Sequence, residues 1–246
     1  MRHYALIPLL LGYCACAQVY LGNRVGISIG KQLLNDRAPL RTGLDYGYDL
    51  IGGNAAITIE LPITDRSSLQ AELGYVEKGY RSNKYNGFIG SAPEQLFRLG
   101  YADLSVFYKW SALSGNVRPE IFAGPAVAYT LRLRDESVAS TYVFEDPIST
   151  ASFQSGEDRP VDHLAPWEIS AVAGAGIILQ PGVARIHLNY RYLYGLTSIY
   201  RYDVVYADVN GQSIVSGGQF NRTHLITLGF SIPLSREVWD ETPSDR

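Results

Sequence analysis

Cysteine is nearly absent from this sequence, and long apolar runs are absent beyond its first residues. The chain of 246 residues contains two cysteines, Cys14 and Cys16, close together near its start. A disulfide framework or a cysteine-based metal site further along the chain is therefore excluded. After Gln18 no segment approaches the roughly 20 consecutive apolar residues of a membrane-spanning helix.

An excess of charge of one sign is also missing. The chain has 21 Lys and Arg against 24 Asp and Glu, a formal net charge of −3. A protein that binds nucleic acid usually presents a basic surface, so we expect no nucleic-acid partner. Hydrophobic residues make up 46% of the chain at a mean hydropathy of −0.03. A membrane protein with this composition must therefore carry its apolar surface in alternation with polar residues.

The first residues have the pattern of a secretory signal peptide. Arg2 is a short positive segment, residues 5–12 are apolar, and Ala15-Cys16-Ala17 is a small-residue cleavage site. We expect a signal peptide at 1–17 that is cleaved before Gln18. A lipoprotein signal is an alternative, but neither cysteine follows the Leu-small-small triplet that lipid attachment requires. An N-terminal apolar strand or buried helix is a second alternative, and no amphipathic pattern continues from it.

Residues 185–197 alternate almost without interruption. The odd positions carry Arg185, His187, Asn189 and Arg191, and the even positions carry Ile186, Leu188, Tyr190, Tyr192, Tyr194 and Leu196. Successive side chains of a strand point to opposite faces, so this strand has one charged face and one aromatic, apolar face. Apolar-out and polar-in is the pattern of a lipid-facing barrel strand.

The same alternation recurs in seven other segments. We predict strands at about 21–33, 48–62, 68–81, 96–111, 116–133, 165–180, 183–202 and 220–234. Short connections with turn residues follow the second, fourth and sixth strands, at 62–67, 111–116 and 180–182. Long connections lie between them, at about 34–47, 82–95, 134–164 and 203–219. Short periplasmic turns and long extracellular loops are typical of outer-membrane barrels, and with an even strand number both termini fall on the side of the short turns.

The pattern therefore predicts an all-β protein, an eight-stranded antiparallel up-and-down transmembrane β-barrel over 18–234 in the bacterial outer membrane. A polar periplasmic tail is expected at 235–246. Soluble eight-stranded cups invert this arrangement, with an apolar interior and a polar exterior. Alternation alone leaves that alternative open, whereas the 18 tyrosines of the chain, enriched near the predicted strand ends, favour a membrane interface. Pro125 and Pro233 fall inside predicted strands, where a bulge would accommodate the missing N–H.

Four segments in order resemble a known family. They are Tyr101-Ala102-Asp103 through Tyr108-Lys109-Trp110, Phe122-Ala123-Gly124-Pro125, Ala173-Gly174-Ala175-Gly176 and Tyr192-Leu193-Tyr194-Gly195-Leu196-Thr197. Together they resemble the outer-membrane-protein β-barrel domain family, the small "porin family" barrels common in Bacteroidetes. The resemblance extends over about 22–234 and implies an outer-membrane location, an eight-stranded barrel and, for most members, no defined activity. Residues 227–234 resemble the C-terminal signal that the barrel-assembly machinery reads during insertion, although a polar tail follows them.

The inward face carries charges of both signs. The inward charged residues are Arg24, Glu60, Glu72, Lys78, Asp103, Lys109, Arg118, Glu120, Arg132, Glu168, Arg185 and Arg191. Eight strands leave an interior just wide enough for side chains to fill, so we expect a structural polar network of ion pairs. Its core members are Arg24, Glu60, Glu72, Asp103, Lys109, Arg118, Glu120, Arg185 and Arg191. A narrow gated conduit or a ligand site near the rim is the alternative.

No pattern in the chain indicates catalysis or a cofactor. His163, His187 and His224 follow the signal peptide without a nucleophile motif or a metal-binding pair. The acidic connection at 134–164 lacks the regular spacing of a calcium loop. We therefore expect no catalytic, cofactor-binding or metal-binding residues.

The sequence predicts a non-enzymatic outer-membrane barrel with a polar filled lumen and four extracellular loops, acting in envelope structure or surface interaction. Its expected partners are outer-membrane lipid, lipopolysaccharide and the barrel-assembly machinery, and the pattern does not name an extracellular partner. The alternatives are a small pore or solute-binding barrel and an outer-membrane lipid-modifying enzyme.

Overall fold

The computed structural model describes eight stretches of the chain. They are residues 18–34, 48–85, 91–135, 158–159, 164–199, 204–207, 213–216 and 219–234. The expected signal peptide, the expected C-terminal tail, His163 and most of the acidic connection lie outside the described residues.

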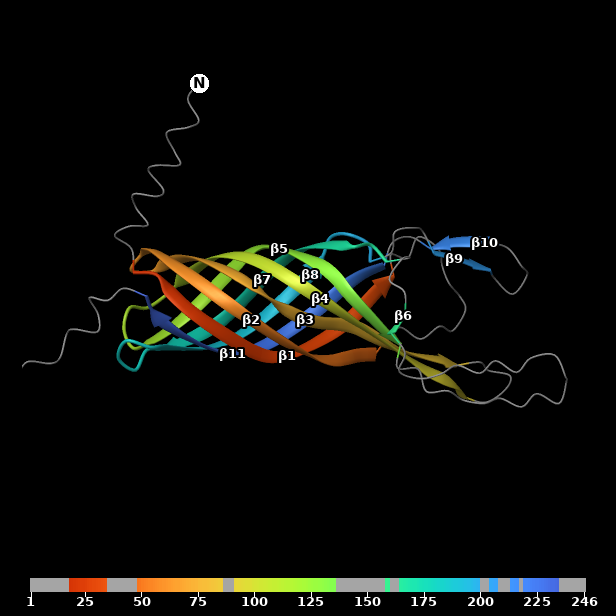
Figure 1. Ribbon diagram of the computed structural model, residues 1–246, viewed down its shortest axis with the longest axis horizontal. Coiled ribbons are helices and arrows are strands. Elements are labelled where there is room, and N and C mark those ends of the chain that lie inside the picture. The colour runs from red at the N-terminus through yellow and green to blue at the C-terminus, as the bar shows by residue number, and fades with distance from the viewer. Residues whose placement is uncertain are drawn as a thin grey trace, which may run out of the picture.

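Eight long antiparallel strands close into a barrel (Figure 1). They are β1 (Tyr20–Leu34), β2 (Tyr48–Thr64), β3 (Ser67–Tyr85), β4 (Ser91–Ser111), β5 (Val117–Asp135), β7 (Trp167–Leu179), β8 (Arg185–Gly195) and β11 (Gln219–Pro233). Each pairs with the next along the chain, and β1 pairs with β11 from Tyr20↔Pro233 to Leu34↔Gln219, which completes the ring. Closure leaves the eight strands without a free edge, so their backbone polar groups can be satisfied inside a bilayer. The predicted fold class is confirmed.

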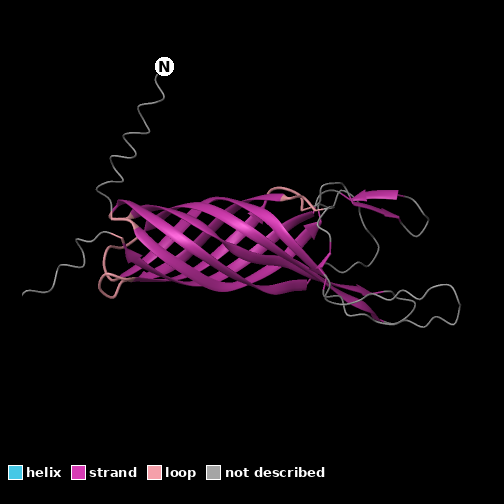
Figure 2. Cartoon of the chain, in the orientation of Figure 1, coloured by secondary structure: helices cyan, strands magenta, loops and turns pink. Residues whose placement is uncertain are grey.

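Three short strands lie outside this ring. β6 (Asp158–Arg159) pairs with β5, and β9 (Val204–Ala207) pairs with β10 (Ser213–Ser216) in a separate hairpin. Figure 2 shows this hairpin and the extensions of β3 and β4 beyond the same end of the barrel. In the described part of the chain no helix is long and apolar enough to cross a membrane.

The opposite end of the barrel carries the short turns. They join β2 to β3, β4 to β5 and β7 to β8, as the sequence predicts. Backbone bonds fasten them to one another, from Ser111 N to Arg66 O at 2.7 Å and from Gln180 N to Asn116 O at 2.8 Å. Gly182 has a φ of 78°, a left-handed conformation that glycine adopts without a steric penalty. The start of β1 and the end of β11 also meet at this end, through Leu234 N and Val19 O at 2.7 Å.

Apolar side chains cover the outside of the barrel. Ile57, Leu73 and Leu188 are 62%, 63% and 54% exposed, whereas Asn189, next to Leu188, is 5% exposed. β8 alternates between buried odd positions and exposed even positions through Tyr190. The soluble-cup alternative is therefore wrong, because the charged side chains are the buried ones. The outside of this barrel is suited to hydrocarbon, as the sequence indicates.

Part of the interior is apolar as well. Buried hydrophobic side chains form one cluster, which includes Leu99, Tyr101, Phe107, Phe122 and Leu193. These residues share the inward phase of their strands with the buried charges.

The ends of several strands differ from the prediction. β3 and β4 continue to Tyr85 and from Ser91, so most of the connection expected at 82–95 is strand. β8 ends at Gly195 although the predicted strand extends to 202. Beyond Gly195, Leu196 N donates to Ile169 O and Ile199 O accepts from Ala165 N, outside a regular ladder. The ends of these strands depend on backbone pairing with the adjacent strands, and the residue pattern of a single segment does not contain that information.

The bulge expected at Pro125 or Pro233 is not seen. β5 keeps a single register with β7 across Pro125, and Pro233 pairs with Tyr20 at the end of its strand. On the β4 side the ladder skips Val106 and Phe107 and resumes in the same register at Tyr108↔Ala123. The missing donor is therefore accommodated by a local gap in the ladder and not by an inserted residue.

Candidate functional site

The inside of the barrel collects charges in equal numbers. Among the described residues, the buried inward cations are Arg24, Lys78, Lys109, Arg185 and Arg191, and the buried inward carboxylates are Glu60, Glu72, Asp103, Glu120 and Glu168. Strand alternation places them there, because each shares the phase of its strand's buried positions. Five charges of each sign balance, so these groups give the lumen no net charge.

Lys109 is the centre of the group nearest the short turns. Its Nζ lies 2.9 Å from Glu60 Oε2 and 2.8 Å from Glu120 Oε2, and donates to Gln70 Oε1 at 2.8 Å. Arg185 donates to the other oxygen of Glu60 at 2.9 Å, and its guanidinium lies 3.5 Å from the ring centre of Tyr20. One lysine thus holds side chains from β2, β3 and β5 together.

Glu72 is the centre of the next group. It accepts two bonds from Arg191, from Nη1 to Oε2 at 2.5 Å and from Nη2 to Oε1 at 2.8 Å. Arg24 contacts the same Oε2 atom. The Arg191 guanidinium also lies 4.8 and 5.0 Å from the ring centres of Phe107 and Phe122. Two parallel hydrogen bonds and the flanking rings restrict the orientation of the Arg191 guanidinium relative to the Glu72 carboxylate. The pair therefore constrains the positions of β8 and β3 relative to each other.

Glu168 is the centre of the third group, which is farthest from the short turns. Its Oε1 accepts from Lys78 at 2.7 Å and from Ser170 at 3.0 Å, and its Oε2 accepts from Asn221 at 2.6 Å. Asn221 Nδ2 also lies within 3.2 Å of the Tyr101 hydroxyl. This group links β3, β4, β7 and β11 across the interior.

The structure places most of the expected network inside the barrel, but one of its arginines lies elsewhere. Arg118 is at the rim near the short turns, where it donates to Gly115 O at 2.7 Å and to Gln180 Oε1 at 3.0 Å. Asp103 lies inside and accepts from the Ser105 hydroxyl at 2.7 Å.

The expectation that Arg132 points inward is wrong. A register shift between Gly100↔Arg132 and Tyr101↔Thr130 leaves Leu131 without a partner on β4. An extra residue in a strand reverses the facing of all residues beyond it. Arg132 therefore points outward, with its side chain 45% exposed.

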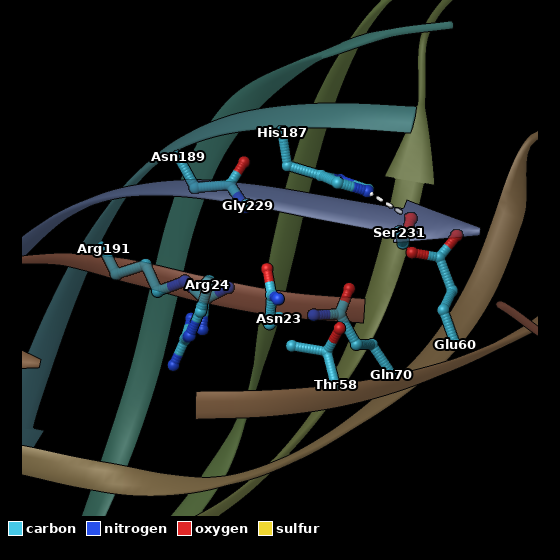
Figure 3. Close-up of a pocket in the computed structure, with 10 residues that line it drawn as sticks. All are labelled: Asn23, Arg24, Thr58, Glu60, Gln70, His187, Asn189, Arg191, Gly229 and Ser231. Atoms are coloured by element: carbon cyan, nitrogen blue, oxygen red, sulfur yellow. Dashed lines mark hydrogen bonds between the residues drawn. The ribbon is translucent and has the colours of Figure 1, made fainter. Parts of the chain in front are cut away.

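Small cavities lie between these side chains, and two of them adjoin the charged groups. One, of about 10 Å³, is lined by residues that include Glu60, His187, Asn189 and Ser231 (Figure 3). The other, also about 10 Å³, lies beside Arg24, Asn54 and Asp103. Each has room for about one water molecule. Arg24, Asn54 and Asp103 all have buried polar atoms without a protein partner, which a water there would satisfy.

His187 and Ser231 form a hydrogen bond in the first cavity, between Nε2 and Oγ at 2.8 Å (Figure 3). A hydroxyl next to an imidazole is the beginning of a nucleophile–base pair, which needs a third group to orient the base. The neighbouring Glu60 has both oxygens engaged by Lys109 and Arg185. A space for one water also admits no acyl or glycan substrate, so this pair is suited to a structural role. No group of three metal-ligating side chains occurs in the described residues.

Sequence reasoning missed two sets of residues. Asn221 was not singled out, since an uncharged amide in a predicted strand gives no signal of its own. Glu77 and Arg98 also went unnoticed, although their parity with the outward Leu73 and Leu104 could have placed them on the lipid side. Their side chains pair there at 3.1 Å.

With this geometry established, comparison with known proteins identifies the family. The sequence matches the outer membrane protein beta-barrel domain over residues 17–201. The chain belongs to this family of outer-membrane barrels. No curated protein is significantly similar to this family member.

Several solved outer-membrane proteins are similar to this chain at low sequence identity. Neisserial surface protein A has 14% sequence identity and a TM-score of 0.42, over 87% of this chain and 96% of its own. Outer membrane protein OprG from Pseudomonas aeruginosa has 10% identity and a TM-score of 0.43, over 88% and 96%. The outer membrane protease OmpT from Escherichia coli has 11% identity and a TM-score of 0.44, over 88% and 97%.

Proposed function

We propose that this protein is a non-enzymatic outer-membrane barrel whose lumen is closed by interlocked side chains. It acts in envelope structure or surface interaction through the four connections at the end opposite its short turns. The observation that carries the proposal is a pair of contacts across the full width of the barrel. Glu72 of β3 bonds Arg191 of β8, and Tyr101 of β4 bonds Asn221 of β11. In the ring order these partners are four strands apart in either direction, so each contact spans the lumen.

The charge balance of the interior supports a closed lumen. Ion-selective pores use rings of one sign, which hold mobile counter-ions along the path. Among the described residues, the buried cations and carboxylates that point inward are equal in number and largely bonded to one another. A permeating ion would have to break a buried pair, and removing one partner from such a pair costs about 3–5 kcal/mol.

The same proposal includes export and assembly. The signal peptide is cleaved before Gln18, and residues 227–234 at the end of β11 are read by the barrel-assembly machinery. The short turns and both barrel ends then face the periplasm, and the long connections face the exterior. There they meet lipopolysaccharide and a partner whose identity the chain does not reveal.

Planar-bilayer conductance tests this proposal. The wild type, folded as judged by a shift in gel mobility on boiling, should give no sustained large conductance. The variant Glu72→Ala/Arg191→Ala removes a cross-lumen contact and one charge of each sign, although Arg24 also loses its Glu72 partner. It should admit small, short-lived currents. Sustained nanosiemens-scale channels in the wild type would show that the lumen is open and that the small-pore alternative holds.

Within the part of the chain that the structure describes, the Ser231–His187 hydrogen bond is a feature that favours a lipid-modifying enzyme. Expression in a Gram-negative host should nevertheless leave the mass of lipid A unchanged. A mass change that disappears in Ser231→Ala would assign that pair a catalytic role and refute the non-enzymatic proposal.

A further inference from the structure

Four side chains on the outside of the barrel form a charged cluster above the apolar band. Glu77 accepts bonds at both carboxylate oxygens. Its Oε1 accepts from Arg132 and from the Tyr75 hydroxyl, each at 3.2 Å, and its Oε2 accepts from Arg98 at 3.1 Å. The backbone N–H of Gly53 also donates to Oε2, at 3.1 Å. Glu77 thus occupies the interruption in the β2–β3 ladder, where the register shifts between Asp49 and Asn54.

This cluster faces the lipid side and not the lumen. Tyr75 and Arg132 lie over Gly100, where an added Cβ would be 2.5 Å from the tyrosine hydroxyl and 3.1 Å from the arginine Cγ. The Arg132 guanidinium lies 5.9 Å from the Tyr75 ring centre. On the same strands, the outward residues nearer the short turns are exposed and apolar, such as Leu73 and Leu104.

The height of the cluster matches a membrane surface. From Trp110 to Arg98, β4 runs roughly 40 Å along its axis at about 3.3 Å per residue. A strand tilt of about 45° converts this to roughly 28 Å across the membrane, close to the apolar band of about 25 Å in such barrels. With Trp110 at the end of the short turns, Arg98 and Arg132 lie at the headgroups of the opposite, outer leaflet.

The cluster places two guanidinium groups on one carboxylate. Arg98 and Arg132 contact Glu77 at 3.1 and 3.2 Å, and 45% of the Arg132 side chain is exposed. A charge facing lipid is costly unless a counter-charge neutralises it. In the outer leaflet the abundant counter-charges are the phosphates of lipid A, and a guanidinium binds phosphate through two parallel N–H bonds.

We propose that Arg132 and Arg98, held in place by Glu77 and Tyr75, form a binding site for a phosphate group of lipid A on the outer surface of the barrel. This inference rests on the proposed orientation, in which the short turns face the periplasm. Glu77 is a positioning residue that fixes the two arginines side by side. Tyr75 is the interfacial aromatic residue beside the bound headgroup.

Lipid retention measured by native mass spectrometry tests the site. The full barrel is folded into phosphatidylethanolamine vesicles that contain a small fraction of lipid A, and is then extracted into mild detergent with EDTA present. The wild type should retain lipid A, and Arg98→Gln/Arg132→Gln should lower the retained fraction at least about tenfold. Arg66→Gln, in the β2–β3 turn at the other end, is the matched control and should retain the wild-type fraction. Retention should survive EDTA because arginine, not a bridging cation, binds the phosphate.

Two further arms keep the proposal testable if the double variant fails to fold. Wild-type protein offered lipid A with both phosphates removed should retain no more than the double variant does. Phosphatidylglycerol in place of lipid A tests the other phosphate source and should be retained less than lipid A. Glu77→Gln removes the carboxylate that holds both arginines side by side, so it should lower the retention of lipid A, and wild-type retention in this variant would refute the positioning role.

Equal retention by the wild type and the double variant would overturn the proposal. So would equal retention of phosphorylated and dephosphorylated lipid A. The readout does not depend on the lumen, because a barrel that conducts ions can still hold lipid A. Failure of this site is therefore distinguishable from failure of the closed-lumen proposal.

Discussion

Arg191 and Glu72 face each other across the centre of the barrel and exchange two hydrogen bonds, of 2.5 and 2.8 Å. Both side chains are almost fully buried, with 2% and 1% of their surface exposed. Their strands, β8 and β3, are four apart in both directions around the ring. The pair therefore acts as a strut, and the cross-section of the barrel is defined by side chains as well as by strand pairing.

Glu72→Gln should destabilise the barrel by about 3–5 kcal/mol, because it removes the buried counter-charge that Arg191 and Arg24 share. Urea unfolding in lipid vesicles, followed by tryptophan fluorescence and gel mobility, measures the change in free energy. Asp65→Asn in the exposed β2–β3 turn is the control, and its effect should stay within about 0.5 kcal/mol. A loss below about 1 kcal/mol in Glu72→Gln would mean that water enters the lumen and screens these charges.

Gly174→Ala tests how tightly the interior is packed around the phenylalanine rings that flank Arg191. A Cβ at Gly174 would lie 2.5 Å from two ring atoms of Phe122 and 2.5 Å from Tyr190 O. We expect a destabilisation of about 1–3 kcal/mol from overpacking. Gly53→Ala is the matched control, because an added Cβ there meets nothing within 4 Å. Equal unfolding midpoints for the two variants in vesicles would contradict a tightly packed interior.

The sequence determines the face of a side chain much better than its partner. Alternation correctly separated Leu188 from Asn189 and Leu104 from Asp103. It could not join Glu72 to Arg191, since these residues are 119 positions apart and their heights depend on the register of every strand between them. The expected ion-pair partners were accordingly left unassigned.

Arg132 shows where alternation itself fails. One unpaired residue, Leu131, reverses the phase of β5. The bulged stretch of β5 itself contains no glycine or proline from which the bulge could be predicted. An arginine expected in the lumen therefore joins Glu77 on the outside. Bulges are set by pairing across strands, which a single-strand pattern does not contain.

Leu188→Arg should impair folding into bilayers. Leu188 lies on the outside in the middle of β8, and an arginine at a lipid-facing midplane position costs roughly 2–4 kcal/mol. Leu188→Met, which keeps the position apolar, is the matched control and should fold as the wild type does. The yield of the heat-modifiable band after folding into vesicles of defined lipid measures both. Similar yields for the arginine and methionine variants would place residue 188 outside the hydrocarbon.

The central claim is that the apolar outside of the barrel lies in membrane hydrocarbon. Nitroxide accessibility tests it directly, with one label at Leu188→Cys and a reference label at Leu113→Cys in the exposed β4–β5 turn. The only native cysteines, Cys14 and Cys16, lie in the expected signal peptide, so each label would be single. In reconstituted vesicles, position 188 should be relaxed by lipid-soluble oxygen far more than by an aqueous nickel chelate, and position 113 should show the reverse. Equal access of the nickel chelate to both positions would contradict the membrane-spanning barrel.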